Sequence, residues 1–183
     1  MQFTLNPESA KKIGSSLAMK SVSIGLIIAY IIMIPLHLQG QEKPVDELFW
    51  IVKWLQSEFA VNIIIGIAAF YGCGYYFGSR AGSDILIKHR NYHWAGPLYG
   101  FLILLTTVFI ASLIGFVQGI IHDVHYLDSS SKISFDLLYN NFIKKIFKPI
   151  AWFSIFGFIP IMLMGLWFGW RIEKKGALAR PSV

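Results

Sequence analysis

Charged residues are scarce in this sequence, making up 14% of its 183 residues, against about 25% in a typical soluble domain. Asp, Glu, Lys and Arg are wholly absent from four long apolar runs, at residues 21–39, 60–78, 97–121 and 150–170. Each run is long enough to cross roughly 30 Å of hydrocarbon as a helix. The sequence therefore predicts an all-α integral membrane protein, a single membrane domain with four transmembrane helices over these runs, the second starting near residue 59.

The absence of charge inside the four runs also restricts the function. Proton pumps, ion-coupled transporters and voltage sensors keep ionisable groups within the bilayer, because a charge must move for coupling to occur. This sequence has no such group there, which disfavours a secondary transporter. The chain also has a single cysteine, Cys73, which excludes an internal disulfide and a thiol-relay enzyme.

Motifs of enzymes and of cofactor sites are missing as well. Haem held between transmembrane helices needs facing histidines deep in the bilayer, whereas the five histidines here lie at the ends of the runs or between them. The sequence has no phosphate-binding Gly–Lys–Ser/Thr motif, no zinc-protease motif and no Ser–His–Asp spacing. We therefore expect no enzymatic activity and no cofactor.

The charges that are present are distributed unevenly between the loops. The segments before residue 21, at residues 79–96 and after residue 170 carry ten basic and three acidic groups, whereas residues 40–59 and 122–149 carry six basic and seven acidic groups. The positive-inside rule then predicts that both termini lie in the cytoplasm of a bacterial inner membrane. The net charge of +6 reflects this topology and contact with anionic lipid headgroups, and does not indicate direct nucleic-acid binding.

Two amphipathic segments lie in the loops on the opposite, outer side. The first, at about residues 44–57, has apolar residues at helical spacing and carries Trp50 and Trp54 one turn apart, as interfacial helices often do. The second, at about residues 133–147, repeats this pattern before the fourth run. The predicted layout is two hairpins of two spans, each with an amphipathic interfacial helix on the outer side.

Three local features complete the predicted layout. Asn6 is placed to cap a first helix that leads into the first span. If the second span continues as a helix past residue 78, Arg80, Asp84 and Lys88 stack four residues apart and pair their charges. Pro160 lies within the fourth run and predicts a kink or break there.

Histidines at the outer ends of the spans offer the best candidate metal ligands. Imidazole and carboxylate groups suit zinc or copper. At the outer ends of the first and third runs the candidate ligands are His37, His122, Asp123 and His125. A weaker pair, His89 and His93, lies on the cytoplasmic side, where contact of the basic loop with lipid is the better explanation.

Glycines spaced four apart are the most distinctive pattern in the chain. Such spacing lets the backbones of two membrane helices approach closely, so that dispersion holds them together. The cytoplasmic ends of the second, third and fourth spans carry seven of these glycines, and the outer end of the third span carries two. In chain order they are Gly74, Gly78, Gly82, Gly96, Gly100, Gly165 and Gly169, followed by the outer pair Gly115 and Gly119. With no partner stripe at its depth, the outer pair predicts contact between subunits and hence a homo-oligomer.

The sequence favours a non-enzymatic membrane scaffold that self-associates and docks a cytoplasmic protein partner. The expected docking surface, or lipid-contact surface, consists of the basic residues Arg80, Lys88, Arg90, Arg171, Lys174 and Lys175. The opposing interpretation is that these charges only set the topology.

Two other functions stay open at this point. One is a metal or redox protein that uses the outer histidines. The other is a pore-forming or membrane-perturbing effector, with a pore lined by polar residues of the spans, Asn62, Thr106, Thr107 and Gln118. In size and layout the chain resembles the small multi-span membrane components of bacterial anti-phage systems, such as the membrane subunit of the Kiwa system, although it shares no diagnostic motif with them.

Overall fold

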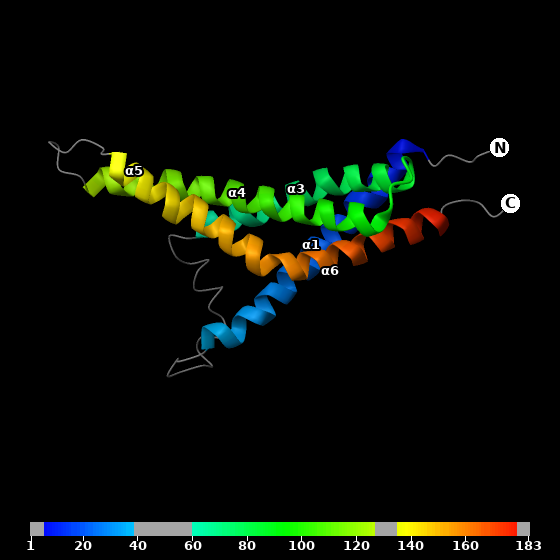
Figure 1. Ribbon diagram of the computed structural model, residues 1–183, viewed down its shortest axis with the longest axis horizontal. Helices are drawn as coiled ribbons and strands as arrows, with labels where there is room; N and C mark the ends of the chain where they lie inside the picture. The colour runs from blue at the N-terminus through cyan, green and yellow to red at the C-terminus, as the bar shows by residue number, and fades with distance from the viewer. Residues whose placement is uncertain (1–5, 39–59, 127–134, 179–183) are drawn as a thin grey trace.

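The computed structural model describes residues 6–38, 60–126 and 135–178, and these residues form helices with one short connection between α3 and α4. The described elements are α1 (Pro7–Leu38), α3 (Ala60–Leu86), α4 (Tyr92–Tyr126), α5 (Phe135–Phe142), η1 (Ile143–Phe147) and α6 (Lys148–Leu178) (Figure 1). The predicted all-α class is confirmed for this part of the chain. The predicted surface helix at residues 44–57 lies outside the described residues, as do the first two residues of the one predicted at 133–147.

Helix α4 contains the clearest candidate for a membrane span. Its segment Tyr92–Ile121 is long and apolar enough to cross a bilayer. A second candidate arises if Leu138–Trp152 and Gly157–Leu178 are taken together as one bent span. Helices α1 and α3 also extend over the first two apolar runs. The four-span arrangement as two hairpins stays a prediction.

Helix α1 begins where the sequence predicts a helix start. The backbone N–H of Glu8 donates to the side-chain oxygen of Asn6 at 3.0 Å, so Asn6 caps the first turn. Pro7 takes the first helical position, where an N–H would have no partner within the helix. The helix then continues through Lys20 to Leu38, so the predicted N-terminal helix and first span form one element.

The last part of the chain is a continuous but bent helical stretch. Elements α5, η1 and α6 follow one another without a gap and run back along α4 (Figure 1). Phe142 of α5 meets Phe116 of α4 edge to face, with 6.5 Å between ring centroids. The segments Leu138–Trp152 and Gly157–Leu178 meet at an angle of 50°. Pro160 accounts for this bend, because it lacks an N–H and its ring displaces the carbonyl group four residues earlier.

Helices α1 and α3 cross at a stripe of small residues. Gly14 of α1 lies so close to α3 that an added Cβ atom would stand 2.7 Å from the backbone nitrogen of Gly82. Ala10 and Ala18, one turn to either side, face Gly82 and Gly78 respectively. The two backbones are therefore in contact, which is the geometry that small residues permit between membrane helices.

Helices α4 and α6 cross at a second glycine stripe. Gly96 lies against the backbone of Gly165. A Cβ atom added to Gly169 would stand 2.7 Å from the carbonyl oxygen of Tyr92 and 3.1 Å from the Cα of Gly96. Gly100, one turn further along α4, is at ordinary van der Waals distance from Gly165. The bundle is thus built from two tight pairs, α1 with α3 and α4 with α6, which are joined through the α3–α4 contact.

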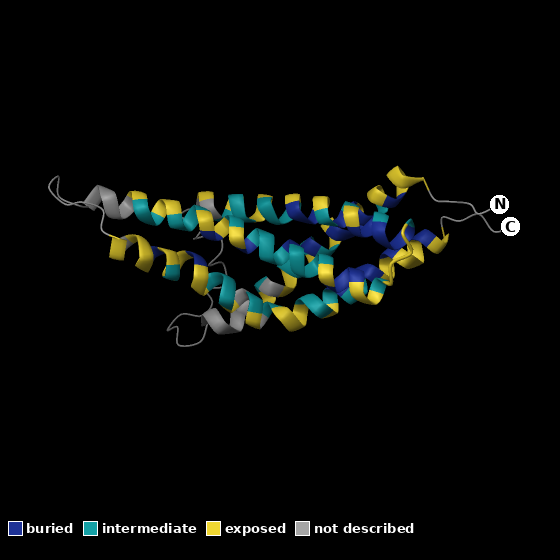
Figure 2. Cartoon of the chain, turned by 45° about the horizontal axis from the view of Figure 1, so that its top comes forward, coloured by how far each residue is buried: buried dark blue, intermediate teal, exposed yellow. Residues whose placement is uncertain are grey.

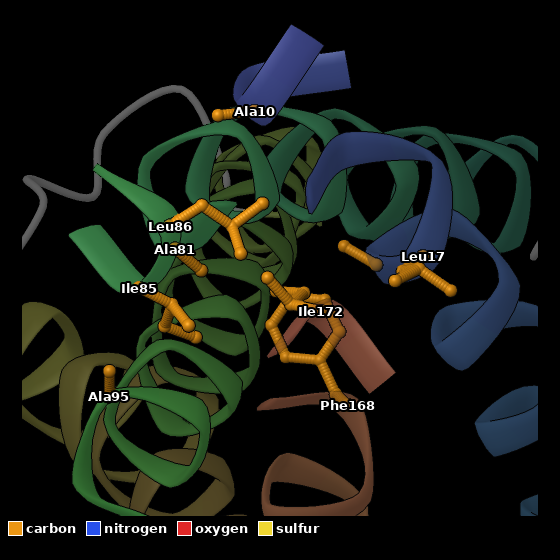
Figure 3. Close-up of a cluster of buried hydrophobic side chains, with 9 residues drawn as sticks. Ala10, Leu17, Ala81, Ile85, Leu86, Ala95, Phe168 and Ile172 are labelled. Atoms are coloured by element: carbon orange, nitrogen blue, oxygen red, sulfur yellow. The ribbon is translucent and has the colours of Figure 1, made fainter. Parts of the chain in front are cut away.

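The best-packed part of the molecule is the end that holds both chain termini and the α3–α4 connection, here called the terminal end. Buried residues concentrate there (Figure 2). All four long helices contribute to one cluster, and Ile172 in it is completely buried (Figure 3). The large side chains of the cluster are Leu17, Ile85, Leu86, Phe168 and Ile172. The terminal end is therefore a four-helix core.

A smaller cluster continues the packing away from the terminal end. Val22 of α1, Cys73 of α3 and Ile103 of α4 form its buried centre. Beside it the hydroxyl groups of Ser23 and Tyr71 are 2.7 Å apart and join α1 to α3. Beyond this point α1 separates from the other helices, as Figure 1 shows, and exposes apolar side chains at Ile27, Ile28 and Ile31.

Candidate functional site

Asp84, near the end of α3, is the only acidic side chain that is buried among the described residues. Lys88 brings its Nζ atom to 2.9 Å from Oδ1, which is the pairing that the four-residue spacing predicts. Tyr99 of α4 donates its hydroxyl proton to Oδ2 at 2.8 Å. Asp84 therefore ties the end of α3 to the start of α4.

The connection between α3 and α4 brings a second cation to the same carboxylate. His89 has φ 51°, in the left-handed region that few residues other than glycine adopt. After this turn the Arg90 backbone N–H donates to the Asp84 carbonyl at 3.0 Å, and the Arg90 Nη1 atom lies 3.2 Å from Oδ2. Asn91 then caps α4 by accepting the His93 backbone N–H at 2.9 Å.

These contacts determine the charge state of Asp84. Burial is the strongest single influence and raises the pKa of the carboxyl group. Hydrogen bonds from Lys88 and Tyr99, with the positive charges of Lys88 and Arg90, together outweigh burial and bring the pKa below its ordinary value of 3.8. Asp84 is therefore ionised at neutral pH and is a fixed negative charge in the terminal end.

A row of cations and indole rings lines the last turns of α6. The Arg171 guanidinium carbon lies 5.2 Å from the ring centroid of Trp167 and 5.5 Å from that of Trp170. Lys174 places its Nζ atom 5.1 Å from the Trp170 ring. These cation–π contacts hold the positive groups in position at the surface. On α4, Trp94 is 78% exposed although it is a large aromatic residue.

An open cleft of about 650 Å³ lies between the α3–α4 connection and the end of α6. We call it the terminal cleft. Its lining includes the polar residues His89, Arg90, Asn91, His93, Glu173 and Lys174, together with Trp170. The His93 ring lies against the Tyr92 ring at a tilt of 33°, with 3.9 Å between ring centroids. The cleft thus combines cationic groups, imidazoles and an indole face at one end of the bundle.

The six basic residues predicted as a docking surface separate into two groups. Arg90 and Lys174 line the terminal cleft, with Arg171 on the same row of α6. Arg80 and Lys88 line a different cleft, between α1, α3 and α4. Lys175 is exposed on the last turns of α6 and lines neither cleft.

The predicted glycines are likewise divided, between two helix crossings and an outer surface. Gly74, Gly78 and Gly82 face α1, and the four glycines of α4 and α6 face each other. Sequence reasoning missed the α1 half of the first crossing, Ala10, Gly14 and Ala18, which a search for all small residues spaced four apart would have found.

The outer glycine pair of α4 has two different environments. A Cβ atom added to Gly119 would lie 3.3 Å from the Asn141 side-chain oxygen and 3.6 Å from Lys145, so Gly119 faces α5 and η1 of its own chain. Gly115 has no atom within 4 Å of the corresponding position. Any contact between subunits at this pair therefore centres on Gly115.

Among the described residues no three His, Cys, Asp or Glu side chains come together. The side chains of His37, His122, Asp123 and His125 lie outside the described residues. Helices α1 and α4 carry them, and along the described residues no Cα atom of one helix lies within 8 Å of a Cα atom of the other. The weaker pair, His89 and His93, lines the terminal cleft.

The polar residues proposed to line a pore are accounted for in part. The Thr107 hydroxyl donates to the Ile103 carbonyl at 2.7 Å, which satisfies it within its own helix. Gln118 has a partner within the chain, Thr106 is partly buried, and the Asn62 side chain lies outside the described residues.

Comparison with known protein families, curated proteins and solved structures finds no match for this chain.

Proposed function

We propose that this chain is a non-enzymatic subunit of a bacterial inner-membrane assembly, which self-associates and docks an acidic cytoplasmic protein at its terminal cleft. In this proposal four helices span the membrane as two hairpins, and both termini lie in the cytoplasm. The docking site rests on one observation: Trp170 and Lys174 line the terminal cleft, and Trp94, which directly follows the cleft residue His93 in the chain, is 78% exposed. The uncharged interior of the spans supports the membrane location and argues against ion-coupled transport.

The chemistry of the terminal cleft supports a protein partner. Trp and Arg are enriched among the residues that dominate binding energy in protein interfaces, whereas a solitary exposed Trp is unfavourable in water. Arg171 and Lys174 are already held against indole rings, so less side-chain entropy is lost when they bind a partner. Because Glu173 is the only acidic side chain lining the cleft, the net charge favours carboxylates on the partner.

Photo-crosslinking in cells tests the docking site. We expect a photoreactive phenylalanine analogue in place of Trp94 to crosslink a cytoplasmic protein, and the same analogue in place of Ile159 to crosslink none, although Ile159 is 69% exposed. When Arg171→Glu and Lys174→Glu are added to the protein that carries the photoreactive residue at position 94, the crosslinking yield should fall at least about tenfold, because the acidic partner is then repelled. Crosslinks from position 94 to lipid alone would contradict a protein partner.

Self-association has a separate test at Gly115. We expect Gly115→Leu to disrupt the assembly in detergent, giving the mass of a single chain, 20.7 kDa, by light scattering after subtraction of detergent. Gly66→Leu is the matched control, because Gly66 also has open space at its Cβ position but lies on α3. An unchanged mass for Gly115→Leu would show that subunits do not meet at this glycine.

A further inference from the structure

A second cleft of about 650 Å³ lies between α1, α3 and α4, apart from the terminal cleft. We call it the inter-helix cleft. Three cationic side chains line it: Lys11 of α1, Arg80 of α3 and Lys88 of the α3–α4 connection. The hydroxyl-bearing residues Tyr76, Ser79, Ser83 and Tyr99 line it as well, together with the Asp84 carboxylate. This lining has a net positive charge and many hydrogen-bond donors.

The carboxylate in the inter-helix cleft is already occupied by protein groups. Asp84 accepts contacts from Lys88, Arg90 and Tyr99, all between 2.8 and 3.2 Å. By contrast, neither Lys11 nor Arg80 has an acidic partner anywhere in the described part of the chain. Two positive charges therefore face the cleft without a counter-charge from the protein.

Two serine hydroxyl groups in the inter-helix cleft also make no side-chain hydrogen bond within the described residues. Ser15, Ser21 and Ser23 each donate to a carbonyl of their own helix, as serines in apolar helices commonly do. Ser79 and Ser83 make no such side-chain hydrogen bond within the described residues. Their hydroxyl protons are available for a ligand that offers several oxygen acceptors.

The depth of the inter-helix cleft matches the polar boundary of a membrane. Arg80 lies two residues beyond the uncharged run that ends at residue 78, and its guanidinium carbon stands 4.8 Å from the Tyr76 ring centroid. On the apolar side of this boundary Tyr76, which lines the cleft and belongs to the uncharged run, is 51% exposed. A ligand seated here would contact cations and hydroxyls at one end and apolar surface at the other.

We propose that the inter-helix cleft binds the phosphate headgroup of an anionic phospholipid from the cytoplasmic leaflet. Lys11 and Arg80 contact the phosphate oxygens, Ser79 and Ser83 donate hydrogen bonds, and the acyl chains run past Tyr76. The site rests on the membrane placement in the proposed function, but not on the docking of a protein partner.

Native mass spectrometry of the purified full chain tests this site with phosphatidylglycerol, phosphatidylcholine and inorganic phosphate as separate probes. We expect phosphatidylglycerol to remain bound in preference to phosphatidylcholine. The double variant Lys11→Gln with Arg80→Gln should lower phosphatidylglycerol occupancy at least about tenfold, because two charge-assisted contacts are lost. Lys12→Gln with Lys175→Gln removes the same charge outside both clefts and should change occupancy less than about twofold.

Three results would overturn the proposal. Equal losses in the two double variants would indicate diffuse attraction to the basic end, without a specific site. Binding of inorganic phosphate as tight as that of phosphatidylglycerol would identify a free anion, and equal binding of both lipids would remove the role of headgroup charge. Membrane fractionation is measured first. A soluble chain would contradict both the membrane placement and the proposed function. A membrane-resident chain without lipid preference would contradict only the lipid site in the inter-helix cleft.

Discussion

Gly14→Ala is expected to destabilise the protein by about 2 kcal/mol or more, although alanine is the better helix former. The new methyl group would meet the Gly78 carbonyl oxygen and the Gly82 backbone at less than van der Waals distance. Because the obstructing atoms belong to the backbone of α3, a rotamer change cannot relieve the clash. Thermal unfolding in detergent should show a midpoint lower by about 4–8 °C.

Gly25→Ala provides the matched control on the same helix. Gly25 has no atom within 4 Å of an added Cβ, so alanine there meets open space. Its expected effect is a gain of up to about 1 kcal/mol from helix propensity, opposite in sign to the effect at Gly14. A Gly14→Ala protein as stable as the Gly25→Ala protein would show that α1 and α3 do not touch at this crossing.

Asp84→Asn is expected to cost about 1–3 kcal/mol, because the asparagine keeps the shape but loses the charge that Lys88 and Arg90 neutralise. Only a weaker hydrogen bond from Tyr99 would remain. Asp136→Asn, which removes an exposed carboxylate on α5, should change the stability by less than about 0.5 kcal/mol. Chemical or thermal unfolding in one detergent measures both changes.

The same substitution has a pH signature. The pKa of Asp84 is lower in the folded protein than its ordinary value of 3.8, so its full contribution to the stability of the folded protein is present above pH 3.8. The contribution is lost as the pH falls below about 4, through the folded-state pKa. Wild-type stability should therefore fall more steeply on acidification than that of Asp84→Asn. Parallel profiles would show that Asp84 is not the group responsible.

The sequence predicted those features that depend on local spacing. Apolar runs without charge correctly placed helical residues, and the four-residue interval from Asp84 to Lys88 predicted an ion pair that is present in the structure. The capping role of Asn6 followed in the same way from neighbouring residues. In each case the interacting groups lie within one or two helical turns of each other.

Features that depend on the path of the chain were not predictable. The return of Arg90 to Asp84 requires the left-handed backbone of His89, which no local pattern marks at a residue other than glycine. The partner of Gly78 and Gly82 is Gly14, about 65 residues away. Gly14 was overlooked because it lies before the first apolar run, and partners were sought only among the glycines of the spans. Likewise, the division of the basic residues between two clefts follows from the crossing of α1 over α3.

Cys73 provides a natural kinetic probe of the α1–α3 pair. It is the only thiol in the chain, and it is buried between Val22 and Ile103. A maleimide reagent reaches this sulfur only when the helices separate, so the alkylation rate relative to that of a free thiol equals the fraction of time the pair is open. No engineered cysteine is needed, and the equilibrium between closed and open forms can be read on the unmodified protein.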